Sequence, residues 1–462
     1  MPGMFRFRSV VVSLILGLAL VASACTSTRV DGSTSSVTDG SDTTATSLDT
    51  TTTEVPLTTL PPDSIPGTSS DSIAPEVAAA MREEIGALML DAEENRGLPF
   101  ISVPTVTILD AADFRARVRT ALEHDLDPDE LAAQEALFKL LGLLDEDADL
   151  QATLLELYTE QFAGFYDLDA KELVVPVSID GITPLQKMVI IHELVHALTD
   201  QHFDFNDERI RRLDEGNGDD ATSLLAFVEG DATYQQFLYL ESLSPDEAVQ
   251  VAIEFQSIDR SVLDLAPQWM QKDLAFPYEN GLRFIGEIVA TGGLKGVDEA
   301  YQDLPISSEQ ILDPNKYQRS EQPDDMPPLT ASLNGWNLDA EATFGEWGIR
   351  VLLSETLLPG VTTQAAAGWG NDGYRLFTRG DDAAFVWQYL GETEQDAEDL
   401  VDGLIVHIRK TMDAGPSQES GGGLLFESTD PYVFIDRVDQ SIFFIAATDP
   451  VAGADLREQL GL

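Results

Sequence analysis

The segment Ile191-His192-Glu193-Leu194-Val195-His196 constrains this chain more than any other, because it predicts both a helix and a metal site. Side chains four residues apart lie one above the other on the same face of an α-helix, so His192 and His196 can reach one metal ion. Glu193 lies about 100° further round the helix, which places its carboxylate beside the metal, where it can hold a water molecule. With only five histidines in the chain, this spacing rarely arises by chance. The motif therefore predicts a zinc site for hydrolysis, with Glu193 as the catalytic general base.

A zinc site for hydrolysis needs a third protein ligand and one open position. The first candidate is Glu229, which lies on a predicted second helix beside Gly230, a residue that would let this helix approach a neighbour closely. The arrangement resembles that of gluzincins, in which a glutamate on a second helix completes a site of two histidines and one glutamate. The alternative third ligand is His202, whose spacing from the two motif histidines is similar to the metzincin pattern HExxHxxxxxH.

Each candidate departs from its family in one position. Metzincins turn sharply at a glycine where this chain has Thr199, and a continuous helix would place His202 roughly 100° away from the motif histidines. Gluzincins carry an aspartate four residues after the glutamate, where this chain has Thr233, and Asp231 points elsewhere on a straight helix. The glutamate is therefore the preferred third ligand. His202, Tyr234 and Asp231 are kept as candidates for stabilising the transition state or orienting a ligand.

The N-terminus has the pattern of an export signal, predicted over residues 1–24. Arg6 and Arg8 precede an apolar stretch from Val10 to Ala24 that is too short to span a bilayer comfortably. Small residues before Cys25, the only cysteine, resemble a bacterial lipobox, in which the cysteine is lipidated. We therefore expect a lipoprotein that a lipid on Cys25 anchors to the cell membrane, facing outside the cytoplasm. Ala22-Ser23-Ala24 also fits an ordinary signal-peptidase site, which leaves simple secretion as the alternative.

Composition divides the rest of the chain. Residues 25–72 are rich in Ser, Thr, Asp, Gly and Pro with almost no large apolar side chains, which predicts a disordered tether. The remaining length exceeds one ordinary core, and we expect one unit over residues 73–330 and another over 331–462. The 27 basic and 81 acidic residues give a net charge of −54, which argues against nucleic acid as a partner.

Periodicity and turn residues predict the secondary structure. The motif helix should begin near Thr183, which can cap it, and Pro184, which suits a first helical turn. Further helices are expected over residues 76–95, 128–144, 150–160, 219–240, 345–357 and 395–412. Strands are expected over residues 100–109, 162–166, 172–177, 374–378, 384–389, 424–427, 432–438 and 442–447.

The run from Ile191 to Asp204, together with Phe227–Ala232, resembles a family of exported bacterial and archaeal HExxH proteins. Phe276-Pro277-Tyr278, Ser307–Leu312 and Ala367-Gly368-Trp369-Gly370 are similar to further landmarks of that family. The resemblance covers roughly residues 160–447. It implies an α+β protein with a predominantly helical, zincin-like metallopeptidase domain that holds a small sheet, followed by a C-terminal α+β domain. In zincins an edge strand before the motif helix pairs with extended substrate, and residues 172–177 are the candidate here.

Together these features predict a zinc metallopeptidase that cleaves a peptide or protein substrate at the cell envelope. The alternative is a lipoprotein without catalytic activity that uses a zincin-like scaffold for binding or envelope assembly. Glu193 favours the enzyme, because a purely structural zinc site gains little from such a carboxylate and is more often closed by four protein ligands.

Overall fold

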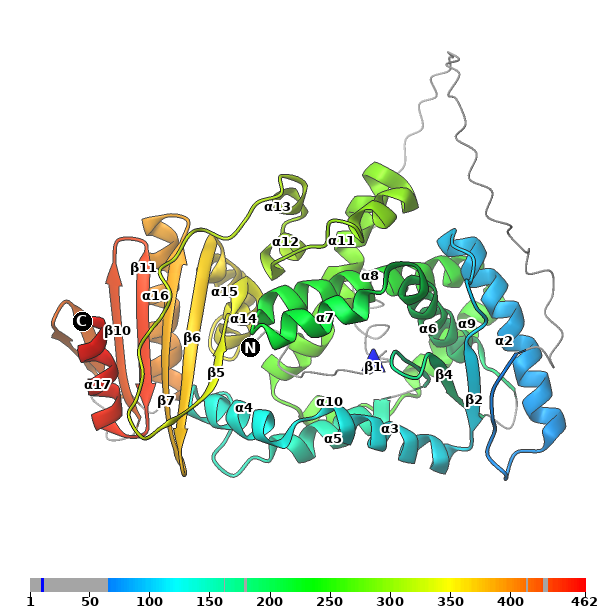
Figure 1. Cartoon of the computed structure of the whole chain (residues 1–462), viewed down its shortest axis with the longest axis horizontal. Helices are drawn as coiled ribbons and strands as arrows, with labels where there is room; N and C mark the ends of the chain where they lie inside the picture. Colours follow the sequence, from blue (N-terminus) through cyan, green and yellow to red (C-terminus); the bar gives the residue numbers. More distant parts are fainter. Residues whose placement is uncertain (1–9, 12–64, 162, 178–180, 413, 427–430) are drawn as a thin grey trace, which may run out of the picture.

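The computed structural model describes residues 10–11, 65–161, 163–177, 181–412, 414–426 and 431–462, and it shows an α+β protein (Figure 1). Cys25, most of the predicted signal peptide and the predicted tether up to residue 64 lie outside the described residues. Among the described helices, none combines the length and the apolar character needed to cross a membrane.

The described helices, in chain order, are α2 (Pro75–Arg96), α3 (Ala111–Asp125), α4 (Pro128–Leu140), α5 (Leu150–Gln161), α6 (Pro184–Phe203), α7 (Phe205–Asp214), α8 (Gly218–Ser242), α9 (Pro245–Gln256), α10 (Ser261–Leu265), α11 (Gln268–Ala300), α12 (Ser308–Leu312), α13 (Pro314–Gln318), α14 (Gly345–Leu353), α15 (Pro359–Ala366), α16 (Glu394–Thr411) and α17 (Pro450–Leu460). The described strands are β1 (Val10–Val11), β2 (Thr105–Leu109), β3 (Phe165–Asp167), β4 (Glu172–Pro176), β5 (Asn337–Ala342), β6 (Trp369–Arg379), β7 (Asp382–Gly391), β8 (Ser417–Ser420), β9 (Gly423–Phe426), β10 (Tyr432–Val438) and β11 (Ser441–Ala447). Each predicted helix and strand is present with shifted ends, and the strand expected from residue 100 begins at Thr105.

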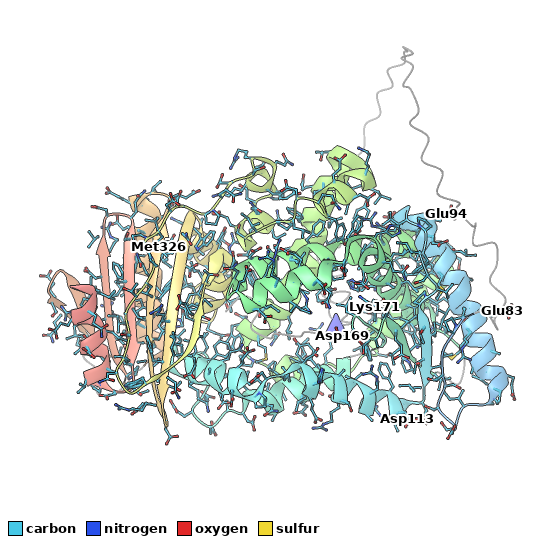
Figure 2. All side chains as sticks on the ribbon, viewed as in Figure 1. Glu83, Glu94, Asp113, Asp169, Lys171 and Met326 are labelled. Carbon is cyan, nitrogen blue, oxygen red and sulfur yellow. The ribbon has the colours of Figure 1, made fainter. Side chains whose placement is uncertain are left out.

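A small mixed sheet lies against the motif helix α6. Its strand order is β1-β3-β4-β2, with β2 parallel to β4 and the other two pairs antiparallel. The expectation that residues 172–177 form an edge strand is therefore wrong, because β4 pairs with a strand on each side. The edge strands are β1 and β2, and β3 lies between β1 and β4. The turn between β3 and β4 carries Asp169 and Lys171 and lies beside β1 (Figure 2).

The motif helix α6 begins and ends at residues that suit helix boundaries. The Thr183 side chain accepts a hydrogen bond from the backbone N–H of Gln186 at 3.3 Å, and Pro184 occupies the first turn, as predicted. Almost every side chain from Leu185 to Asp200 is buried, which is typical of a helix packed on all sides. The helix continues past the position at which metzincins turn, and it ends at Asp204, whose φ of 49° is left-handed.

Two glycines allow helix α8 to cross helix α11 at very short distance. A Cβ atom on Gly230 would lie 2.3 Å from the carbonyl carbon of Gly281, and one on Gly281 would lie 2.0 Å from the carbonyl oxygen of Ala226. Neither position can therefore hold a side chain unless the helices separate. The prediction that Gly230 allows a close approach is confirmed, and the neighbour is α11.

The C-terminal sheet has seven strands in the order β5-β6-β7-β11-β10-β9-β8, and all of its pairs are antiparallel. Alternate residues of β10 face opposite sides of the sheet. Val433 and Ile435 join the hydrophobic cluster that includes α16, whereas Phe434 joins the one that includes α17. The two helices therefore cover opposite faces. The cluster on the α16 side also contains buried side chains of α3, α4 and α5, so this core crosses the predicted boundary at residues 330/331.

Buried carboxylates fasten the start of α14 to both α8 and the C-terminal sheet. Asp372 accepts hydrogen bonds from the backbone N–H groups of Phe344 and Gly345 and from the indole N–H groups of Trp369 and Trp387, at 2.7–2.9 Å. Four donors satisfy this carboxylate, which compensates for removing it from water.

The second buried carboxyl group is that of Asp219, in the first turn of α8. It accepts a hydrogen bond from the backbone N–H of Ser308 at 3.0 Å, and it lies so close to Gly345 that a Cβ there would overlap it. Burial raises the pKa of Asp219 to about 8, with the hydrogen bonds of Ser308 opposing the rise and the charge of Asp372 adding to it.

Candidate metal centre

Three side chains from α6 and α8 converge on one point. The Nε2 atoms of His192 and His196 lie 2.9 Å apart, and Oε2 of Glu229 lies 3.1 Å from the first and 3.5 Å from the second. These residues form the one group of three or more potential ligands found among the described residues, and all three are buried. The histidines of the motif and the preferred glutamate therefore meet in a site that could hold a metal ion.

The buried negative charge of Glu229 requires a positively charged or hydrogen-bonding partner. Glu229 is 1% exposed, and burial of a lone carboxylate is costly. Burial would raise the pKa of Glu229, but the charge and hydrogen bonds of His196 and His192 outweigh it and lower the pKa to about 2. The carboxylate is therefore ionised at neutral pH, and its negative charge faces the two imidazole nitrogens. This is the donor set that a divalent cation with a preference for nitrogen and oxygen ligands would take.

Glu193 follows His192 on α6, and its carboxylate faces the small sheet. Its Oε2 atom accepts a hydrogen bond from the backbone N–H of Tyr166, in β3, at 2.8 Å. Glu193 is fully buried and is not part of the converging group of three. A carboxylate next to His192 in the chain, with a strand N–H donating to one of its oxygens, suits a group that handles a proton.

The alternative third ligand is placed elsewhere. Because α6 is continuous to Phe203, His202 points away from the motif histidines, and its Nε2 atom lies 2.7 Å from the carbonyl oxygen of Pro99. His202 is therefore not among the converging groups. The proposal that it completes the site is wrong, for the steric reason that no turn interrupts the helix after His196.

The other two polar candidates on α8 also lie away from the donor atoms. Asp231 accepts a hydrogen bond from Nε of Arg96 at 2.9 Å and another from the Tyr301 hydroxyl at 3.2 Å, so it joins α8 to α2 and α11 instead of orienting an imidazole. Tyr234 is five residues past Glu229, roughly 140° round the helix, and is half-buried against the hydrophobic cluster around α6. Neither placement brings the side chain to the metal donors.

One imidazole of the site lacks a hydrogen-bond partner at its second ring nitrogen among the described residues. In metal-bound histidines, the N–H of the second ring nitrogen usually donates a hydrogen bond to a carboxylate or carbonyl oxygen. Nδ1 of His196 has no hydrogen-bond partner among the described residues, and neither has Oγ1 of Thr233, the residue that stands where gluzincins have an aspartate. Within the described residues, no side chain therefore orients this ring through its Nδ1 atom.

Two further residues near the centre had no recognisable signal in the sequence. Arg209, on α7, is 5% exposed; burial lowers its pKa to about 10, while the charges of Asp125 and Glu229 oppose that change. It therefore stays protonated at neutral pH and adds a positive charge near Glu229. Tyr278, on α11, is buried, and its ring centroid lies 6.2 Å from that of His192. Tyr278 belonged to a family landmark, but no spacing linked it to the metal motif.

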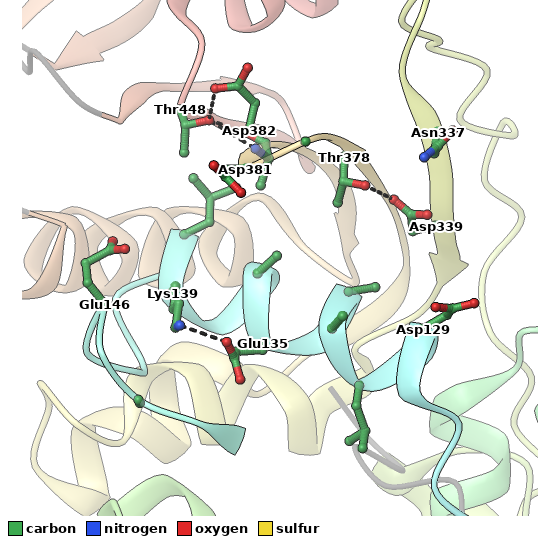
Figure 3. Close-up of a pocket in the computed structure, with 18 of the residues that line it drawn as sticks. Asp129, Glu135, Lys139, Glu146, Asn337, Asp339, Thr378, Asp381, Asp382 and Thr448 are labelled. Carbon is green, nitrogen blue, oxygen red and sulfur yellow. Dashed lines mark hydrogen bonds and ion pairs between the residues drawn. The ribbon is translucent and has the colours of Figure 1, made fainter. Parts of the chain in front are cut away.

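The structure also contains a cavity of about 1370 Å³ that none of the metal-site residues lines. It lies between α4 and one end of the C-terminal sheet (Figure 3). Its walls are strongly acidic, with the carboxylates of Asp129, Glu135, Glu146, Asp149, Asp339, Asp381 and Asp382. Lys139 pairs with Glu135 at 2.8 Å, and the Thr378 hydroxyl donates to Asp339 at 2.5 Å. This cavity has the character of a solvated acidic surface, in keeping with the net charge of the chain.

Comparisons with known proteins bear mainly on the C-terminal region. A family model described as a domain of unknown function (DUF8575) matches residues 334–455. His192, His196 and Glu229 lie outside this range. No curated protein matches the sequence. A crystal structure from Chloroflexus aurantiacus, described as "a putative hydrolase with a novel fold", is similar over 54% of this chain and 93% of that one, with 16% identity and a TM-score of 0.35.

Proposed function

We propose that this protein is a zinc-dependent peptidase of the gluzincin type. The observation that carries the proposal is the meeting of two imidazoles and one carboxylate from two helices, with Glu193 next to the first histidine in the chain. Ligands held tetrahedrally at 2.0–2.1 Å from one zinc ion lie about 3.3 Å from each other. The three donor atoms of His192, His196 and Glu229 are 2.9, 3.1 and 3.5 Å apart, which fits that arrangement.

The chemistry follows from which groups are ligands and which is not. Zinc, when bound, supplies a Lewis acid that lowers the pKa of water toward about 7 and polarises a carbonyl group. Three protein ligands leave a fourth position for water or substrate. Glu193 is outside the ligand set, so its carboxylate can take a proton from the attacking water and deliver it to the leaving amide nitrogen. Arg209 would offset part of the negative charge that Glu229 and Glu193 bring into this buried site.

The surroundings of the motif helix support a zincin-like arrangement. A mixed sheet packs against α6, and its antiparallel strand β3 lies toward one edge. Val10–Val11, an extended segment, pair with β3 in antiparallel orientation, with Val11 opposite Tyr166. An extended peptide substrate would pair with β3 in the same way, beside Glu193. These two valines belong to the predicted signal peptide, so its removal would open this edge.

We further propose that the peptidase works outside the cytoplasm, tethered to the membrane by a lipid on Cys25. The support is the sequence alone: a basic and apolar N-terminus, small residues before a lone cysteine, and a long stretch without apolar side chains. On this proposal the substrate is a peptide or protein segment that reaches the cell envelope.

The test is a Glu193→Gln variant beside the wild type. Glutamine keeps the shape and an acceptor for Tyr166 but cannot take a proton, so zinc content should stay at one per chain while cleavage of a peptide library falls by at least about a hundredfold. Equal cleavage by both proteins would contradict the role of Glu193. A wild type that binds zinc and cleaves nothing in the library would instead favour the binding or assembly role.

A further inference from the structure

One residue of the small sheet, Tyr166, is held twice by the motif helix. Its backbone N–H donates to Oε2 of Glu193 at 2.8 Å, and its hydroxyl donates to Oδ2 of Asp200 at 3.3 Å. Glu193 and Asp200 are seven residues apart, which is almost two full turns, so both carboxylates leave the same face of α6. Tyr166 is fully buried between them. The strand that orients Glu193 is therefore itself fixed by a second carboxylate on the same helix.

Asp200 has a dedicated counter-ion. Nζ of Lys171 lies 2.8 Å from Oδ1 and 2.7 Å from Oδ2 of Asp200, and the aspartate side chain is 1% exposed whereas that of the lysine is 52% exposed. Burial raises the pKa of Asp200, while the hydrogen bonds and charge of Lys171 oppose that rise. A carboxylate is costly to bury, and here it is compensated by one cation and one hydroxyl that both belong to the β3–β4 hairpin.

The hairpin is also shaped to present the lysine. Lys171 has a φ of 53°, in the left-handed region, at the end of the turn that leads into β4. Oδ1 of Asp167 accepts the backbone N–H groups of Asp169 and Ala170 at 3.1 and 2.8 Å, which closes the turn. Oδ2 of Asp167 accepts from Arg117, on α3, at 2.5 Å. The strand β3 is thus held by α6 at Tyr166 and by α3 at Asp167.

We propose that Asp200, paired with Lys171, is a positioning residue for Glu193. It fixes Tyr166, and thereby the backbone N–H that holds one oxygen of the Glu193 carboxylate and keeps this carboxylate in one orientation beside the imidazoles. This inference rests on the proposed function, in which Glu193 is the general base. Asp200 touches neither the metal ligands nor, on this proposal, the substrate, and acts only through Tyr166.

The test compares four variants and one control with the wild type, all in the zinc-loaded protein. Asp200→Asn removes the charge that holds Lys171, Tyr166→Phe removes only the hydroxyl, and Lys171→Met removes the cation from the surface side. Lys171→Arg keeps the cation and should restore the wild-type behaviour. Asp204→Asn is the matched control, because Asp204 lies one turn beyond Asp200 at the C-cap of α6 and makes no side-chain cap hydrogen bond. Its charge raises the pKa of Asp200, so its removal leaves the pairing of Asp200 with Lys171 in place.

The first measurement is hydrogen exchange of the backbone amide of residue 166, which requires no catalysis. Exchange should become at least about tenfold faster in Asp200→Asn and Tyr166→Phe, less so in Lys171→Met, and stay unchanged in Lys171→Arg and Asp204→Asn. The amides of residues 192–196 should keep their protection. Wild-type exchange at residue 166 in both Asp200→Asn and Lys171→Met would overturn the proposal.

The second measurement is the split between kcat and KM at constant zinc content. Asp200→Asn should lower kcat at least about tenfold, with KM within about twofold and one zinc per chain, and it should add nothing in a Glu193→Gln background. Loss of zinc in parallel with activity would overturn the proposal in favour of a purely structural role. If the wild type cleaves no peptide, the proposed function fails, and the exchange measurement alone then decides whether Asp200 orients this strand.

Discussion

Replacing Gly230 by alanine tests the placement of the glutamate ligand most directly. The new Cβ would lie 2.3 Å from the carbonyl carbon and 2.4 Å from the carbonyl oxygen of Gly281, where ordinary contacts begin at 3.4 Å. Helices α8 and α11 must then separate by about 1 Å, and overpacking of this kind costs about 1–3 kcal/mol. The better helix propensity of alanine offsets about 1 kcal/mol of that cost. We expect a net loss of about 0–2 kcal/mol in the free energy of unfolding, measured with urea.

The same shift should reach the metal. Glu229 is the preceding residue, and zinc coordination tolerates only about 0.2 Å of displacement. Zinc affinity, measured by competition with a chelator, should therefore fall at least about tenfold. Gly286→Ala is the control, because it lies on α11 and its Cβ would meet no atom within 4 Å; it should gain about 1 kcal/mol and bind zinc as the wild type does. If both variants behave alike, the close crossing of α8 and α11 is refuted.

Three further predictions concern single carboxylates. Glu229→Ala should weaken zinc binding at least about a hundredfold by chelator competition, whereas Glu241→Ala, exposed on the same helix, should not change it. Asp219 has a folded pKa of about 8, above its ordinary value of 3.8, so the folded state keeps a proton that the unfolded state releases. Stability should therefore fall as pH rises from about 4 to 8, by about 1.4 kcal/mol per pH unit, and Asp219→Asn should flatten this slope in urea titrations at pH 5, 6 and 7. Asp372→Ala leaves four buried donors without their acceptor and should cost about 3–5 kcal/mol by urea titration; Asp381→Ala, exposed in a β-turn, should cost less than about 0.5 kcal/mol.

The elements that the sequence predicted well are those with strong local signals. Thr183 and Pro184 mark the start of α6, and alternation with β-branched side chains marks β10 and β11. The strand β5 was missed because most of its side chains are exposed and none is buried, which hides the alternation of a strand. Which strand lies at an edge was also beyond reach, because pairing partners depend on contacts far apart in the chain.

The three converging side chains were predictable for a reason that does not extend to their neighbours. His192 and His196 are fixed relative to each other by helix geometry alone, and Glu229 was suggested by the resemblance to the gluzincin arrangement and by Gly230 beside it. Arg209 and Tyr278 reach the same region through helix packing, which no short spacing records. The link from Asp200 to Glu193 runs through a backbone N–H of β3, and a backbone group leaves no trace in a sequence.

The hydrophobic cluster beside α16 determines whether parts of this chain can fold when they are expressed or exchanged separately. Side chains of α3, α4 and α5 pack with those of the seven-stranded sheet, so this hydrophobic core is built from residues on both sides of position 330. A gene fragment ending near residue 330 would leave those helices with a wide apolar face in water and invite aggregation. The stretch matched as a domain would have the complementary problem if it were expressed alone. Recombination that shuffles one half without the other should therefore be disfavoured, and the two halves should descend together.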